Sequence, residues 1–172
     1  MGRKAKYSTL STYQPFVDYI RRDLGIAPEV EILVKFNDMN KALRMNVAAG
    51  WAGFSYGVYT ISISRYFNHI ATLQFLMHEL KHIQQMLDKR LYRRFENRNG
   101  NVAWHWYWLG KPVELVRPEV NHDAYMGQEW EKEAYDYQWD TDTLFPDGKL
   151  TPIKTYIGAA NNGKVKFYKV KG

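Results

Sequence analysis

The stretch His78-Glu79-Leu80-Lys81-His82 lies in the middle of the longest helix that the sequence predicts, residues 68–88. An apolar stripe at helical spacing supports that helix, formed by Leu73, Leu76, Leu80, Ile83 and Leu87. At about 100° per residue, the two histidines lie only about 40° apart, so both imidazoles can reach one metal ion. The stripe lies on the opposite side. We therefore expect a helix that is anchored by its leucine face and lines a cleft with its histidines.

The composition restricts what kind of metal site the chain can form. The sequence contains no cysteine, which excludes thiolate sites and leaves His, Asp and Glu as ligands. Two histidines at this spacing on a helix favour zinc, with His78 and His82 as ligands. Glu79 lies about 100° from His78 and flanks the metal position, which suits a general base acting on a metal-activated water.

A catalytic zinc needs a third protein ligand, and a second predicted helix offers candidates. This helix, residues 123–139, carries Glu129, Glu131 and Glu133. Glu131 points about 160° away from Glu133, so it is not expected to bind the metal. Glu133 precedes the small residue Ala134, which would let the two helices approach closely. The sequence therefore predicts Glu133 as the third ligand, with Glu129 as the alternative.

Other polar residues could support the site. Asp136 or Asp140 could accept the free N–H of a zinc-bound histidine. An oxyanion partner should be a donor facing the metal, and the candidates are Tyr125, His105 and His122. Tyr125 is the predicted catalytic partner, although a structural hydrogen-bonding role is the alternative for all three.

The rest of the chain alternates between helix and strand signals. We expect a helix at 12–24, a strand at 29–36, two strands within 51–63, hairpin arms at 90–96 and 102–109, and a short edge strand near 164–167. Residues 38–49 fit a short helix or a loop. In the second hairpin arm Trp104, Trp106 and Trp108 share one face, which favours a packing role over a substrate subsite.

The motifs together resemble a known enzyme family. The pentad His78–His82, followed by a helix reading Glu129-Trp130-Glu131-Lys132-Glu133-Ala134, resembles the zincin metallopeptidases of the gluzincin branch. The order of motifs is also similar to small bacteriophage-encoded proteins assigned as metallopeptidases, and Gln85 matches a glutamine of their pattern. The resemblance covers residues 29–140.

This resemblance implies a fold and an activity. The fold would be α+β and zincin-like, with a mixed or antiparallel twisted sheet, an active-site helix and a downstream ligand helix. We expect one such domain at 1–140 and a C-terminal extension at 141–172. The activity implied is zinc-dependent hydrolysis of peptide bonds, with Glu79 as general base, and the strand at 58–63 is the expected edge that binds substrate.

Charge and hydropathy bear on partners and location. The net charge of +6 is spread along the chain, so nucleic acid is not the expected main partner. No segment approaches the ~20 apolar residues of a membrane span, and residues 1–10 do not read as a signal peptide. The expected location is cytoplasmic, in the host cytoplasm if a phage encodes the chain, with the virion as the alternative.

Two other functions stay open at this level. A zincin acting on nucleic-acid-associated protein is suggested by the basic residues Lys89, Arg90, Arg93, Arg94 and Arg98. A non-catalytic phage structural or interaction protein stabilised by zinc would need a closed site with four protein ligands. Its fourth ligand would be one of His69, His105, His122 or Glu129.

Overall fold

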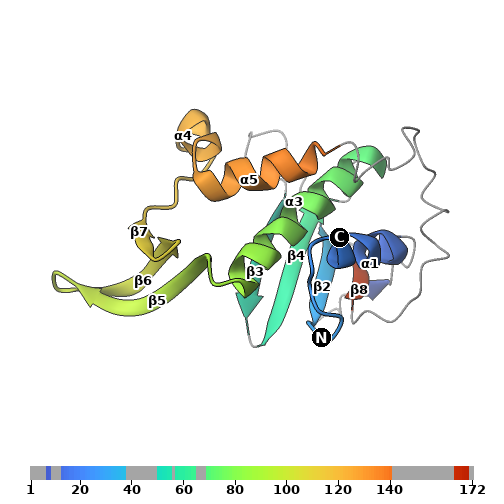
Figure 1. Cartoon of the computed structure of the whole chain (residues 1–172), viewed down its shortest axis with the longest axis horizontal. Helices are drawn as coiled ribbons and strands as arrows, with labels where there is room; N and C mark the ends of the chain where they lie inside the picture. Colours follow the sequence, from blue (N-terminus) through green and yellow to red (C-terminus); the bar gives the residue numbers. More distant parts are fainter. Residues whose placement is uncertain are drawn as a thin grey trace, which may run out of the picture.

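A computed structural model describes residues 7–8, 13–37, 50–55, 57–64, 69–140 and 165–170. Figure 1 shows the elements, which are in chain order β1 (Tyr7–Ser8), α1 (Gln14–Asp23), β2 (Ile32–Asn37), β3 (Gly50–Ser55), β4 (Val58–Ser64), α3 (His69–Leu87), β5 (Leu91–Arg98), β6 (Asn101–Trp108), β7 (Lys111–Val113), α4 (His122–Met126), α5 (Glu129–Gln138) and β8 (Val165–Val170). The protein is α+β, as the sequence predicts.

The main sheet has five strands in the order β1-β8-β2-β4-β3. β2 pairs in parallel with both β4 and β8, whereas β3 pairs antiparallel with β4. β4 is therefore paired on both sides, and the prediction of an edge strand at 58–63 is wrong. β3 forms the edge in the described sheet. Gly57, at φ 80°, allows the tight connection between β3 and β4.

The main core lies between this sheet and two helices. α1 and α3 lie on the same face of the sheet in Figure 1, and α3 contacts β3 and β4. The predicted leucine stripe of α3 is buried in this core, with Leu76, Leu80 and Ile83 fully inaccessible to solvent. α1 ends before Gly25, whose φ of 67° is the left-handed conformation typical after a helix C-terminus. The leucine face of α3 thus fixes where its histidines point.

A second, three-stranded sheet forms an arm that extends from the main body (Figure 1). β5 and β6 are antiparallel and are joined at Asn99 and Gly100, with φ values of 53° and 85°. These positive angles are the type I′ turn geometry that an Asn-Gly pair favours. Trp108, at the base of the arm, is buried against Trp130 of α5, with ring centroids 5.9 Å apart. This contact joins the arm to α5.

The predicted single helix at 123–139 is two helices, α4 and α5. The break falls at Gly127 and Gln128, because Gln128 has an extended backbone with φ −65° and ψ 132°. The Gln128 side-chain amide bonds both backbone groups of Val116, at 2.9 Å to its N–H and 3.2 Å to its carbonyl oxygen. This pairing replaces a turn of helix and lets α5 pack along α3 independently of α4.

The C-terminal strand β8 lies between β1 and β2, whereas the sequence predicts it at an edge. Residues 38–49 and 141–164 lie outside the described residues, so the division of the chain at residue 140 stays a prediction. None of the helices in the described part of the chain combines the length and apolar character needed to cross a membrane.

Candidate metal centre

Three donor atoms from two helices meet at the interface of α3 and α5. The Nε2 atoms of His78 and His82 are 3.1 Å apart. The Oε2 atom of Glu131 lies 3.3 Å from the first and 3.5 Å from the second. All three side chains are buried, so the cluster lies inside the protein, where charged groups require partners. These three residues form a group that could hold a metal ion.

The spacing of these donors fits a small four-coordinate metal ion. Donors at about 2.0–2.1 Å from a tetrahedral centre are separated from each other by about 3.3–3.4 Å. The three observed separations, 3.1, 3.3 and 3.5 Å, bracket that value. The three atoms therefore match three corners of a tetrahedron around an ion, and no donor from the described residues joins them at the fourth.

Glu131, not the predicted Glu133, completes the cluster. The Glu133 carboxylate instead accepts two hydrogen bonds from Arg90, at 2.7 and 2.9 Å, and pairs with Lys81 at 3.0 Å. The alternative Glu129 is engaged too, because it accepts the indole N–H of Trp108 at 2.7 Å. The structure therefore brings Glu131, rather than the predicted Glu133 or Glu129, to the two histidines, and both predicted carboxylates contact neighbours of α5 instead.

The buried face of α5 explains the correction. That face is formed by Trp130, Glu131, Ala134 and Gln138, which fall within about 100° of one another on the helix. Ala134 does mark the close approach to α3, as its full burial shows. However, the acid on the same face as Ala134 is Glu131, three positions earlier, and not its immediate neighbour Glu133. The Trp130–Ala134 pair at i, i+4 was the sequence signal that points to Glu131.

Gln85 holds His82 in the orientation that a metal ligand needs. Its Oε1 atom accepts the Nδ1–H of His82 at 2.9 Å, and its Nε2 atom donates to the carbonyl oxygen of Trp130 at 3.0 Å. Gln85 is fully buried. It therefore fixes the His82 tautomer with Nε2 toward the cluster and ties α3 to the residue before Glu131. The sequence predicted Asp136 or Asp140 for this role, and Asp136 is exposed.

Burial and mutual contacts shift the pKa values of the three cluster residues in different directions. Burial lowers the pKa of His82, but the hydrogen bond and charge of Glu131 outweigh burial and raise it to about 9. Burial likewise raises the pKa of Glu131, but its bonds to both histidines outweigh that effect and lower it to about 2. For His78, burial dominates and lowers the pKa. One imidazolium therefore neutralises the Glu131 carboxylate, and a cation could take its place.

Glu79 lies beside the cluster, with one carboxylate oxygen that no described residue bonds. Burial raises its pKa to about 8. Within the described residues, the buried Oε2 atom of Glu79 and the buried Nδ1 atom of His78 have no hydrogen-bond partner. An acceptor in this position fits a hydrogen-bearing molecule at the open corner of the donor triangle. A cation at the cluster would also lower the pKa of Glu79 toward the range of a working base.

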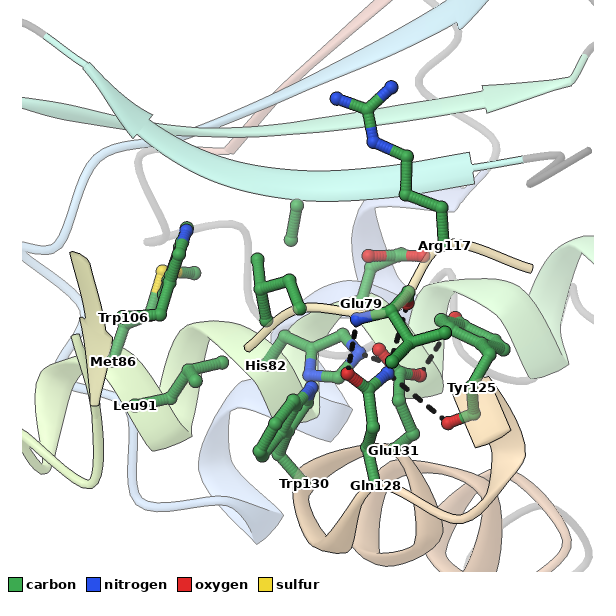
Figure 2. A pocket seen from close by; sticks show the side chains of 13 residues that line it. Glu79, His82, Met86, Leu91, Trp106, Arg117, Tyr125, Gln128, Trp130 and Glu131 are labelled. Atoms are coloured by element: carbon green, nitrogen blue, oxygen red, sulfur yellow. Dashed lines mark hydrogen bonds and ion pairs between the residues drawn. The ribbon is translucent and has the colours of Figure 1, made fainter. Parts of the chain in front are cut away.

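A cavity of about 260 Å³ gives access to this group (the metal-site cavity). Glu79, His82, Tyr125 and Glu131 line its polar end, and Figure 2 shows Met86, Leu91 and Trp106 at the other end. The Tyr125 hydroxyl donates to Glu131 at 2.8 Å. Burial raises the pKa of Tyr125, so its hydroxyl stays a neutral donor at physiological pH. The structure thus places Tyr125 at the cluster, as predicted for a site residue, while its catalytic role stays a prediction.

The other histidines with described side chains lie apart from the cluster. His105 is on β6 and lines a separate cavity with Trp104 and Glu114. His122 is exposed at the start of α4. The side chain of His69 lies outside the described part of the chain. Among the described residues, the metal cluster therefore has three members and no fourth protein ligand.

The basic arm is partly neutralised within the protein. Arg90 pairs with Glu133, and Arg98 pairs with Glu96 at 2.7 Å. Arg93 stacks over Trp104 at 4.6 Å and Arg94 over Tyr92 at 5.2 Å. These four arginines therefore contact acidic or aromatic side chains of the protein itself, and the contacts stabilise the arm.

No protein-family model, curated protein or solved structure matches the chain.

Proposed function

We propose that this protein is a zinc-dependent metallopeptidase with the zincin arrangement that its sequence resembles. The observation that carries the proposal is the triangle of His78, His82 and Glu131 donor atoms, whose sides match a tetrahedral metal site. Glu79 lies next to the triangle with a buried oxygen free to accept a proton. Two neutral nitrogens and one carboxylate form the ligand set typical of a catalytic zinc.

Each residue around the triangle has a separate proposed role in hydrolysis. Bound zinc would supply Lewis acidity, which polarises the scissile carbonyl and makes water more acidic. In this proposal Glu79 would take a proton from the attacking water and pass it to the leaving amine. Tyr125 provides a neutral hydroxyl beside Glu131 that could donate to the developing oxyanion. Gln85 keeps His82 in the metal-binding tautomer throughout.

The number of ligands favours an enzyme over a zinc-stabilised structural protein. A structural zinc site is closed by four protein ligands, whereas a catalytic site keeps one position open. The described cluster has three protein donors, and an acid and a cavity lie beside it. The alternative of a non-catalytic protein stays testable, because such a protein would bind zinc and hydrolyse nothing.

The edge strand β3 is the proposed place for the substrate backbone. In the described sheet its outer edge pairs with no other strand, so its backbone groups can accept an extended peptide. Ala52 of β3 lines the metal-site cavity, which brings this edge next to Glu79 and His82. A peptide added to β3 would therefore pass over the triangle.

Metal analysis of purified variants tests the metal centre. We expect about one zinc per chain in the unmodified protein and a loss of at least tenfold in affinity for His78→Ala, His82→Ala and Glu131→Gln. Glu133→Gln is the matched control, because it removes a carboxylate of the same helix that pairs with Arg90 and Lys81 instead. If Glu131→Gln and Glu133→Gln retain zinc equally, the proposed ligand set is wrong.

A second measurement separates metal binding from catalysis. Glu79→Gln should keep zinc and lose hydrolysis of a quenched fluorescent peptide library by a factor on the order of 10² to 10⁴. The opposite outcome is that the unmodified protein and the Glu79→Gln variant both fold and bind zinc but cleave no peptide in the library. This outcome would support the structural alternative and reject the peptidase.

A further inference from the structure

A second, larger cavity adjoins the metal site. It has a volume of about 570 Å³ and lies between β3, β4 and the arm (the distal groove). Four residues line both this groove and the metal-site cavity, namely Ala52, Met86, Leu91 and Trp106. In Figure 2 the labelled members of this set lie together at the end of the metal-site cavity opposite Tyr125. The two cavities therefore adjoin each other at these four residues, beside β3.

Aromatic rings from two different sheets form the walls of the distal groove. On the main sheet, Phe54 and Tyr59 pack with ring centroids 4.7 Å apart. On the arm, Trp104 lies across the groove with Arg93 stacked on its ring at 4.6 Å. Phe54 and Trp104 remain 49% and 55% exposed, so folding leaves these aromatic surfaces largely uncovered. Apolar surfaces of this kind, facing each other in a cleft, are typical of binding sites.

The register of β3 sets the distance between the groove and the triangle. Ala52 borders both cavities, whereas Phe54, two residues further along the strand, borders only the groove. Two strand residues correspond to about 7 Å. In an extended peptide lying along β3, alternate side chains point the same way. If one peptide side chain lies opposite Ala52, the peptide side chain two positions further along therefore lies opposite Phe54 and faces the groove.

We infer that the distal groove is a subsite for a large apolar side chain, aromatic above all, of the peptide bound along β3. This inference rests on the proposed function and adds a substrate class to it. The side chain belongs two or three residues from the scissile bond, on one side of that bond only. Arg93 at the groove disfavours a basic side chain there, because like charges repel.

Peptide binding to the zinc-loaded Glu79→Gln variant tests this subsite without hydrolysis. A series of extended peptides carries one Phe, Ser or Lys at successive positions, and fluorescence anisotropy gives the dissociation constants. We expect Phe at the groove position to bind at least tenfold tighter than Ser, and Lys no better than Ser. Trp104→Ala in the same background should remove most of that preference, since it removes one wall of the groove.

Val102→Ala is the matched control for the arm. Val102 lies on β6 two residues before Trp104 and is 57% exposed, but it does not line the groove. The Val102→Ala variant should therefore still bind the Phe peptide more tightly than the Ser peptide.

The outcomes separate this inference from the proposed function. Equal affinities for the Phe and Ser peptides in a protein that holds its zinc would overturn the subsite and leave the metal centre standing. A preference that survives Trp104→Ala would also overturn it. A protein that discriminates the peptides but binds no zinc would overturn the peptidase and keep the groove as a peptide site. A protein that binds no zinc and does not discriminate between the peptides would overturn both the subsite and the peptidase.

Discussion

Replacing Gln85 with Leu tests whether this residue controls the metal affinity of His82. The substitution keeps a side chain of similar size and removes two buried hydrogen bonds, at 2.9 Å from His82 and at 3.0 Å to the Trp130 carbonyl oxygen. In the metal-bound state the Nδ1–H of His82 is left buried without an acceptor, which costs about 1–3 kcal/mol. The metal-free state shares part of this cost.

The expected effect on metal binding is therefore smaller than the full penalty. We expect Gln85→Leu to weaken zinc affinity by about 3- to 30-fold, which corresponds to about 0.7–2 kcal/mol. Competition with a chromophoric chelator measures this affinity. Thermal unfolding of the metal-free protein, followed by circular dichroism, measures the separate effect on stability, which we expect to be a few degrees in Tm.

Gln84 provides the matched control for Gln85. It is the preceding residue of α3, and its side-chain amide donates to the carbonyl oxygen of Leu24 at 2.9 Å, away from the metal cluster. Gln84→Leu should lower Tm by a similar amount and leave zinc affinity within about twofold of the unmodified protein. If the two substitutions change zinc affinity equally, then Gln85 acts through general stability and its positioning role is refuted.

Three further predictions concern protons, the site tyrosine and the arm. Because the pKa of His82 is raised to about 9 without metal, this imidazole is protonated at pH 7 and must lose its proton to bind zinc. Zinc binding should release between about one and two protons at pH 7, one from His82 and the other from Glu79, whose pKa of about 8 a bound cation lowers, and it should weaken as pH falls. Calorimetry in buffers of different ionisation enthalpy detects this release; no release would contradict the described ion pair. Tyr125→Phe should retain zinc and lower kcat by about 10²- to 10³-fold with little change in KM, whereas a loss of zinc with unchanged kcat per bound metal would assign Tyr125 to supporting Glu131 alone. Gly100→Ala should lower stability by about 1–2 kcal/mol, because φ at this turn is 85°, and urea unfolding showing no change would mean that the turn adjusts freely.

Local sequence patterns predicted the elements that depend on nearby residues. The leucine stripe of α3 identified the helix and its buried face, since helical spacing alone places those residues together. The Asn99-Gly100 pair identified the hairpin, because few other residues adopt the positive φ values of its turn. The His78–His82 spacing predicted, for the same reason, that the two imidazoles meet on one face of α3.

Prediction failed where the outcome depended on distant contacts. The break between α4 and α5 depends on Gln128 pairing with Val116, twelve residues earlier in the chain. The edge position of β3 depends on which strands pair with β4, and β8 joins the sheet from the far end of the chain. No short pattern contains these partners.

The sequence by itself determined that two histidines and an acid lie within about one turn of a helix whose opposite face is apolar. It also determined, by the absence of cysteine, which kinds of ligand are available. Only the tertiary structure decided that Glu131 completes the triangle while Glu133 pairs with Arg90. The physical reason is that a helix presents several acids in all directions, and the packing of Trp130 and Ala134 against their neighbours chooses the one that turns inward.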